Sequence, residues 1–106
     1  MMARVWRGFA LREKVGEYLE HLQKTVFPGL DRIEGFRGVD VLRRDLPDGV
    51  EISVQTFWES KDAIRKFTGE DITAAVVEPA AKPLFRSYDS TVIHYEMALK
   101  HGPDRS

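Results

Sequence analysis

The chain has 106 residues, of which 42% are hydrophobic and 31% are charged, and this suits one small globular domain. Its 16 lysine and arginine residues nearly balance 17 aspartate and glutamate residues, giving a net charge of -1, so it lacks the dense positive charge that nucleic acid or an anionic membrane requires. It contains no cysteine, which excludes disulfides and thiolate metal sites. No apolar run approaches the roughly 20 residues of a membrane span, and the N-terminus lacks the apolar core of a signal peptide. We therefore expect a cytoplasmic protein.

The first part of the chain alternates in polarity and then becomes helical. Residues 3–10 carry apolar side chains at loosely alternating positions and predict a strand. Apolar residues then recur at helical spacing over residues 12–26, which predicts a helix with one apolar face. Pro28 is expected to interrupt this helix, because it has no N–H to donate to the carbonyl of Lys24. A further short turn is expected over residues 30–33.

The middle of the chain predicts a β-hairpin. Strands are expected over residues 36–44 and 50–58, joined by a turn over residues 46–49 whose sequence Leu-Pro-Asp-Gly favours a tight reversal. Alternation in the second strand separates its side chains into two sets. One face carries Ile52, Val54, Thr56 and Trp58, and the other carries Glu51, Ser53, Gln55 and Phe57.

The second half of the chain predicts a short helix and a last strand. Ser60 is expected to cap the N-terminus of the helix, and Gly69 is expected to end it. The segment over residues 71–88 is apolar but contains two prolines, so one or two short helical turns are expected there. Residues 91–97 alternate again and predict the final strand.

This order of elements predicts an α+β fold, namely a ferredoxin-like βαββαβ domain with a four-stranded antiparallel sheet. One domain is expected over residues 1–106, with a core over about residues 3–97 and a polar, frayed tail over about residues 98–106. Two helices cover only one face of such a sheet. Because apolar residues occur on both faces of the first and last strands, the second face is expected to pack against another copy, forming a homodimeric α+β barrel. The alternative is a monomer with a solvated sheet face.

Four short segments occur in a fixed order along the chain. They are Gly35-Phe36-Arg37-Gly38 before the second strand, Thr56-Phe57-Trp58-Glu59-Ser60 after the third, Phe67-Thr68-Gly69-Glu70-Asp71 closing the second helix, and His94-Tyr95-Glu96 in the last strand. With this order and spacing the sequence resembles the antibiotic biosynthesis monooxygenase (ABM) family of the dimeric α/β-barrel superfamily. The resemblance implies a homodimer with a small-molecule pocket in each subunit, between the sheet and its own helices. Members of the superfamily have diverse activities, so the resemblance specifies the fold better than the reaction.

Haem-degrading members of that superfamily use a strand-1 asparagine, a tryptophan after strand 3 and a helix-2 histidine. Trp58 matches the tryptophan, but residues 3–10 contain no asparagine and no histidine lies between Ser60 and Pro79. We therefore expect that haem is not degraded and that no cofactor is needed. A zinc site is not expected either, because the three histidines of the chain are far apart in sequence.

His94 is the candidate catalytic base or donor. It lies in the middle of a predicted strand, where burial is expected, and a neutral imidazole serves in either role near neutral pH. Glu96 lies on the same strand face. Trp58 is the second catalytic candidate, as a wall of the pocket. The alternatives are a structural histidine hydrogen-bonded at the dimer interface and a tryptophan that only packs in the core.

Four further residues are candidates for substrate binding: Trp6, Arg7, Gln55 and Phe67. Trp6 and Arg7 do not both face the pocket, because neighbours in a strand alternate faces. An inward arginine suits an anionic or phenolate ligand, whereas an outward one is a solvated charge.

The preferred interpretation is a cofactor-independent monooxygenase-like protein that acts on a small aromatic, phenolic or quinol molecule. In such enzymes the substrate loses a proton and then itself activates oxygen, while the protein supplies a dry pocket, a base and oriented donors. The main alternative is a dimeric small-molecule-binding or stress-associated protein without catalysis, and haem binding is a third. A purely aliphatic cavity would favour the non-catalytic alternative. Convergent His94, Trp58 and Gln55 would favour the enzyme.

Overall fold

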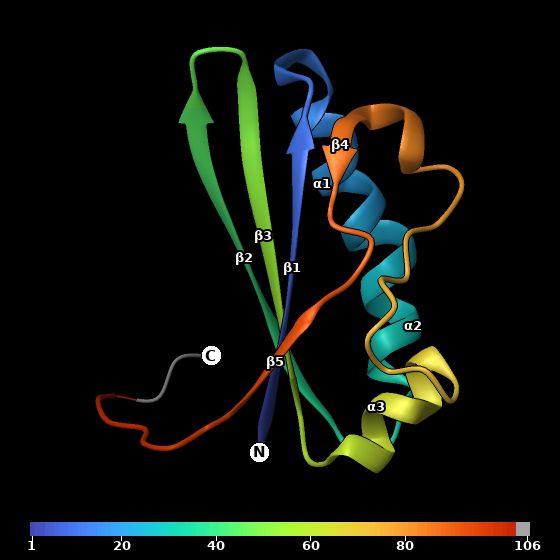
Figure 1. Cartoon of the computed structure of the whole chain (residues 1–106), viewed down its shortest axis with the longest axis vertical. Coiled ribbons are helices and arrows are strands. Elements are labelled where there is room, and N and C mark those ends of the chain that lie inside the picture. The colour runs from blue at the N-terminus through green and yellow to red at the C-terminus, as the bar shows by residue number, and fades with distance from the viewer. Residues whose placement is uncertain (104–106) are drawn as a thin grey trace.

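The computed structural model describes residues 1–103 and shows one antiparallel sheet with all its helices on one face (Figure 1). The strands are β1 (Met2–Ala10), β2 (Phe36–Leu46), β3 (Gly49–Trp58), β4 (Phe85–Tyr88) and β5 (Ile93–Glu96). The helical segments are η1 (Arg12–Lys14), α1 (Val15–His21), η2 (Leu22–Val26), α2 (Phe27–Asp31), α3 (Lys61–Thr68) and η3 (Lys82–Leu84). Of the predicted tail, residues 98–103 contain no helix or strand, and residues 104–106 lie outside the described part of the chain.

The strand order is β2-β3-β1-β4, and β5 also pairs with β1. The last two strands share one edge of β1, since β4 pairs with residues 8–10 and β5 with residues 2–5. They act together as a fourth strand in two pieces, so the predicted ferredoxin-like α+β fold is confirmed. The short helical turn expected within residues 71–88 is present as η3, but the strand that follows it was not predicted, because the chain pairs with β1 from Phe85 onward. A four-residue strand is too short to show an alternating pattern, so only this pairing defines it.

The first helix does not stop at Pro28 as predicted. Residues 22–26 form a π-helical turn, and the N–H of Phe27 donates to the carbonyl of Leu22, five residues back. Pro28 then falls in the first turn of α2, where a missing N–H costs little. The wider π turn thus lets the helical path continue from Val15 to Asp31.

The predicted turn and helix caps are confirmed. Leu46 pairs directly with Gly49, so only two residues connect β2 to β3. The Ser60 hydroxyl accepts a hydrogen bond from the Ala63 N–H at 3.2 Å. Gly69 ends α3 with φ at +86°, a conformation that favours glycine.

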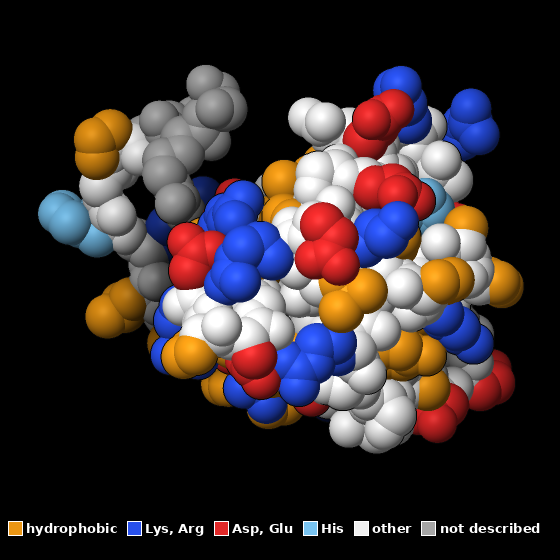
Figure 2. Space-filling model, turned by 90° about the horizontal axis from the view of Figure 1, so that it is seen from above, with side chains coloured by type: hydrophobic (Ala, Val, Ile, Leu, Met, Phe, Trp, Pro, Cys, Tyr) orange, Lys and Arg blue, Asp and Glu red, His pale blue; other side chains and the backbone are white. Residues whose placement is uncertain are grey.

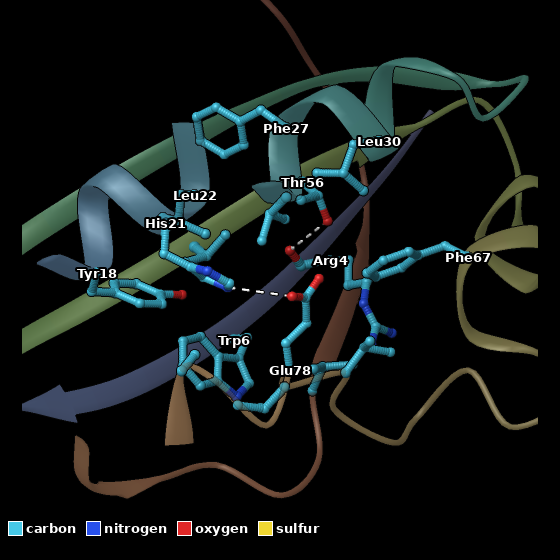
Figure 3. A pocket seen from close by; sticks show the side chains of 16 residues that line it. Arg4, Trp6, Tyr18, His21, Leu22, Phe27, Leu30, Thr56, Phe67 and Glu78 are labelled. Atoms are coloured by element: carbon cyan, nitrogen blue, oxygen red, sulfur yellow. Dashed lines mark hydrogen bonds and ion pairs between the residues drawn. The ribbon is translucent and has the colours of Figure 1, made fainter. Parts of the chain in front are cut away.

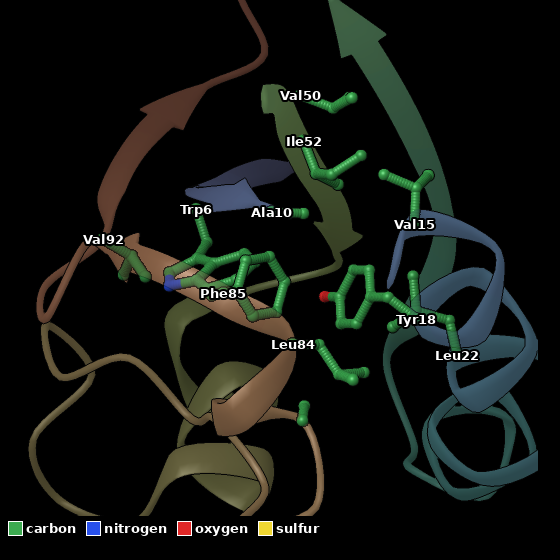
Figure 4. Packing of buried hydrophobic residues seen from close by; sticks show 11 residues of the cluster. Trp6, Ala10, Val15, Tyr18, Leu22, Val50, Ile52, Leu84, Phe85 and Val92 are labelled. Atoms are coloured by element: carbon green, nitrogen blue, oxygen red, sulfur yellow. The ribbon is translucent and has the colours of Figure 1, made fainter. Parts of the chain in front are cut away.

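The core lies between the sheet and the helices and has two parts. The larger part packs β1, β3, α1 and β4 together around Trp6, Tyr18 and Phe85 (Figure 4). The smaller part surrounds Trp58 and Ile64 near α3. Even-numbered residues of β1 face these helices, so the strand contributes to both parts of the core.

The opposite face of the sheet is uncovered and partly apolar. Strand register places a set of apolar side chains on it: Val5, Phe9, Leu42, Phe57, Ile93 and Tyr95. Ile93 is 57% exposed and Tyr95 is 55% exposed, which is high for apolar side chains in a sheet. We call this surface the open face.

Charged groups of opposite sign alternate over the surface at the β2–β3 hairpin end of the molecule (Figure 2). Ion pairs such as Arg44–Glu51 and Arg86–Asp48 lie in this region. Among the described residues, no helix has the length and apolar character needed to cross a membrane.

Candidate functional site

A cavity of about 100 Å³ lies between the sheet and the helices, where the two parts of the core meet (Figure 3). Its walls are mostly aromatic and aliphatic. The aromatic walls are Trp6, Tyr18, Phe27 and Phe67. Four polar or charged side chains also line it: Arg4, His21, Thr56 and Glu78. An apolar pocket with a few convergent polar groups is the usual form of a small-molecule site.

β1 brings Arg4 and Trp6 to the same wall, because residues two apart in a strand share a face. The Trp6 indole N–H donates to the carbonyl of Asp89 at 2.9 Å, which fixes the plane of the ring. The ring also packs edge-on against Phe85, with centroids 5.4 Å apart. Trp6 is therefore a rigid part of the cavity wall.

Arg4 is a buried cation, since only 4% of the residue is exposed. Its guanidinium donates to the carbonyls of Ile72 and Ala74, the latter at 2.8 Å, and lies 5.7 Å from the centre of the Phe67 ring. Within residues 1–103 it has no carboxylate partner. Burial lowers the pKa of Arg4 to about 10, so the group stays charged at neutral pH. A buried charge without a counter-ion is costly, and an anionic ligand would offset that cost.

His94 supports Arg4 from β5. Its Nε2 lies 3.3 Å from Nη1 of Arg4. Because a guanidinium only donates hydrogen bonds, Nε2 must accept, which places the proton of the neutral ring on Nδ1. Burial lowers the pKa of His94, and the nearby charges of Arg4 and Lys61 lower it further.

His21 and Glu78 form the other polar part of the cavity. His21 projects from α1, and its Nε2 lies 3.5 Å from Oε2 of Glu78. That separation is longer than a good N–H···O hydrogen bond, and Nε2 is buried without a hydrogen-bond partner. An unsatisfied buried polar group costs about 1–3 kcal/mol, so a ligand hydroxyl that bonded Nε2 would recover this energy.

A family model described as antibiotic biosynthesis monooxygenase matches residues 1–79. The chain belongs to the antibiotic biosynthesis monooxygenase family. The matched region runs from β1 beyond α3 and holds all the cavity residues except Ala81 and Val92. No curated protein gives a significant match to the chain.

Solved structures share the fold of this family member at low sequence identity. A Bacillus cereus protein described as a candidate antibiotic biosynthesis monooxygenase has a TM-score of 0.65 and 16% identity, covering 99% of this chain and 98% of that one. The haem-degrader MhuD of Mycobacterium tuberculosis, with two haems in its active site, has a TM-score of 0.61 and 18% identity, covering 96% and 100%. A mutant of MhuD with two manganese protoporphyrin IX molecules per active site has a TM-score of 0.64 and 20% identity, covering 97% and 100%. At these identities the likeness establishes the fold and not the ligand.

The cavity does not fit a porphyrin as it stands. Its volume of about 100 Å³ is below the roughly 300–1,000 Å³ of pockets that hold drug-sized ligands. α3 carries no histidine and β1 carries no asparagine. Among the described residues, no group of three or more histidine, aspartate or glutamate side chains is placed to hold a metal ion.

Of the six residues singled out from the sequence, the structure brings Trp6 and Phe67 to the cavity. Trp58 is fully buried behind the wall, where it stacks on Phe67 with centroids 5.6 Å apart. His94 also lies behind the wall, against Arg4. Trp58 and His94 therefore reach the cavity only through the residues that they contact.

Arg7 and Gln55 lie on the open face, away from the cavity. Arg7 is an odd-numbered residue of β1, so its side chain lies on the face away from the helices. Its guanidinium forms an ion pair with Asp89 at 3.2 Å. Gln55 pairs across the ladder with Val5, on the same open face. Neither residue lines the cavity, so the cavity gives no support to the predicted role of either in substrate binding.

Sequence analysis missed Arg4 and His21, although a signal exists for each. Arg4 is two positions from Trp6 and therefore shares its face of the strand. His21 is three positions from Tyr18, on the apolar face of the predicted helix. Each is a polar residue at a position that the pattern assigns to the core, and such residues need a partner there.

Proposed function

We propose that this family member is a cofactor-independent monooxygenase that binds a small phenol or quinol in the cavity, with the anionic oxygen or an acceptor group of the ligand paired to Arg4. Arg4 carries the proposal, because it is a buried cation at the cavity wall with no carboxylate partner in residues 1–103. Charge-assisted hydrogen bonds to such a group are about twice as strong as neutral ones.

The size of the cavity limits the ligand to no more than one aromatic ring. An engineered cavity of roughly 150 Å³ in another protein holds benzene, and the volume here is about 100 Å³. The aromatic walls, above all Trp6 and Phe67, offer ring faces and edges for a planar ligand.

In the proposed reaction the ligand carries the redox chemistry and the chain supplies the environment. Arg4 holds the acceptor group of the ligand and stabilises the negative charge that develops when the ligand loses its proton. His94 orients Arg4 through the contact at Nε2, and Trp58 supports Phe67 from behind. The phenolate then gives electrons to molecular oxygen: a ring C–H bond breaks, one oxygen atom becomes a quinone carbonyl, and the other leaves as water with that hydrogen and the phenolic proton. His94 and Trp58 are thus proposed to act as positioning residues.

A non-catalytic binding protein is the second candidate, because His94, Trp58 and Gln55 do not converge in the cavity and aliphatic side chains such as Val54 and Val92 form much of it. Such a protein would bind the same class of ligand as the monooxygenase but would not catalyse its reaction with oxygen. Turnover therefore distinguishes the two candidates, and binding alone does not.

We also propose that the protein is a homodimer in which the open faces of two copies pack together. The exposed Ile93 and Tyr95 side chains support this arrangement, since burying them would recover hydrophobic free energy. The cavity lies on the other side of the sheet, so each subunit would keep its own site.

The test of function uses Arg4→Met, which removes the charge and keeps a long apolar side chain. Calorimetry with 4-hydroxybenzoate measures binding, and an oxygen electrode with hydroquinone measures turnover. Loss of a charge-assisted hydrogen bond of about 1.5–3 kcal/mol predicts a fall in affinity of about 10- to 150-fold. If Arg4→Met does not fold, Arg4→Lys is used in its place. It keeps the charge and should retain part of the binding.

Arg7→Met is the matched control, because it removes the same charge from the other face of the same strand. It should bind 4-hydroxybenzoate like the wild type. Equal binding by the wild type and a folded Arg4→Met variant would overturn the proposed role of Arg4. Binding without faster oxygen uptake would favour the non-catalytic candidate.

A further inference from the structure

The cavity contains four titratable side chains with different capacities for a proton: Arg4, Tyr18, His21 and Glu78. Arg4 is a cation with donors only. Burial raises the pKa of Tyr18, so its hydroxyl keeps its proton. Glu78 is exposed at the edge of the cavity. Among the described residues of the wall, His21 is therefore the group suited to accept a proton inside the cavity.

The surroundings of His21 favour that role. The side chain is 14% exposed, and its Nε2 has no hydrogen-bond partner. The charged or titratable groups that face it are Glu78 from the loop before η3, Tyr18 from its own helix and Arg4 from β1 across the cavity. The Glu78 carboxylate lies 3.5 Å from Nε2, so an acidic side chain stands beside the atom that would receive the proton.

We propose that His21, held beside Glu78, accepts the phenolic proton of the substrate, and that the substrate is a one-ring phenol with a second acceptor group for Arg4. This inference rests on the proposed function. In this step the O–H bond of the phenol breaks and an N–H bond forms at Nε2. The electron pair of the O–H bond stays on oxygen as the phenolate, and nothing is oxidised or reduced.

The placement of the two polar groups fits a ligand with polar groups at opposite ends. Figure 3 shows His21 and Phe67 on opposite sides of Glu78, and the guanidinium of Arg4 contacts the Phe67 ring. A phenolic hydroxyl at His21 and an acceptor group at Arg4 would place an aromatic ring between them, against the wall formed by Trp6.

The test uses 4-nitrophenol as the probe, because its phenolate absorbs visible light and its phenol form does not. At a pH below its midpoint in solution, the probe bound to wild-type protein should show a larger phenolate fraction than the free probe. His21→Gln should still bind it but lower the ratio of bound phenolate to phenol about tenfold, the effect of one pKa unit. Glu78→Gln should lower the ratio by a smaller factor, and His101→Gln, at an exposed position outside the cavity, should not change it.

The outcomes separate this inference from the proposed function. If the wild type binds the probe and His21→Gln shows the same phenolate fraction, His21 is not the proton acceptor and the proposed function stands. If the wild type does not bind the probe, the proposed function fails and the inference fails with it. Should His21→Gln not fold, an unchanged phenolate fraction in Glu78→Gln would overturn the role of the pair.

Discussion

Arg4 and Arg7 lie three positions apart on β1 and occupy opposite environments. Arg4 is enclosed by backbone carbonyls and the Phe67 ring, whereas half of the Arg7 side chain is exposed beside Asp89. An exposed ion pair such as Arg7–Asp89 contributes about 0–1 kcal/mol, because water screens it. A buried and unpaired guanidinium gains far more from an anionic partner. The face of the strand, rather than the residue type, therefore decides which arginine is suited to bind a ligand.

His94 gives a pH-dependent prediction at the same scale. Its pKa is lowered in the folded protein by burial and by the charges of Arg4 and Lys61. The unfolded chain therefore binds a proton at His94 more readily, and acidification favours unfolding. The stability linked to His94 is complete above its ordinary pKa of about 6.5 and declines as the pH falls below that value. The free energy of unfolding, measured by urea titration between neutral pH and pH 5, should fall less steeply in His94→Ala than in the wild type.

Ligand binding by the same variant tests whether His94 acts through Arg4. At neutral pH, His94→Ala should lose roughly 1–2 kcal/mol of stability. Its affinity for 4-hydroxybenzoate should fall about 2- to 10-fold, as expected for losing one neutral hydrogen bond that orients Arg4. Lost stability with full ligand affinity would assign His94 a structural role alone.

Trp6 and Phe67 line the cavity, since large aromatic side chains at apolar positions point toward a core wherever it lies, and their role in substrate binding stays a prediction. The mutual contact of Arg4 and His94 was not predictable, because it depends on the register of β5 against β1, and register is a tertiary property. The pairing of His21 with Glu78 likewise depends on the path of the loop after α3.

At the scale of elements, Gly35 lies in the connection between α2 and β2 and packs on α3. Its φ is +92°, and an added Cβ would lie 2.5 Å from the Cβ of Ala63. Its carbonyl also accepts the N–H of Glu59 at 2.8 Å, which holds the two connections together. Gly35→Ala should therefore destabilise the fold by about 1–3 kcal/mol through strain and overpacking, measured as a lower midpoint of urea unfolding.

Gly16 supplies the control for that substitution, because it lies in α1 and an added Cβ would meet no atom within 4 Å. Gly16→Ala should stabilise the protein by about 0.5–1 kcal/mol, since alanine is the better helix former. The same glycine-to-alanine substitution is thus expected to lower the free energy of unfolding at Gly35 and to raise it at Gly16. A neutral or stabilising Gly35→Ala would show that α3 shifts to accommodate the new methyl group.

Element boundaries that depend on local chemistry were predictable, and those that depend on distant partners were not. The Ser60 cap, the end of α3 at Gly69 and the two-residue hairpin follow from local side-chain and backbone preferences. The continuation of the helix through Pro28 needs a π turn, which local propensity does not anticipate. β4 is a strand only because it pairs with the edge of β1.

The whole molecule has one covered and one uncovered sheet face, and this asymmetry was visible in the sequence. The expectation that two helices cover only one face of a four-stranded sheet predicted it, and the order of elements predicted the ferredoxin-like sheet. The helices cover one face of the sheet, where Trp6 and the residues around it form the core. Nothing within residues 1–103 covers Ile93 or Tyr95 on the other. The open face is therefore where assembly is expected.

The homodimer is tested by adding charge to that face. Light scattering at micromolar concentration should give about twice the chain mass of 12.2 kDa. Ile93→Lys should shift the protein to the monomer, because a paired interface would bury the new ammonium without a partner. Leu99→Lys is the control, since Leu99 is 91% exposed and lies beyond β5, and it should remain dimeric. Because the cavity is on the opposite side of the sheet, monomeric Ile93→Lys should still bind 4-hydroxybenzoate. A wild type that scatters as a single 12.2 kDa chain would instead mean that the open face is solvated.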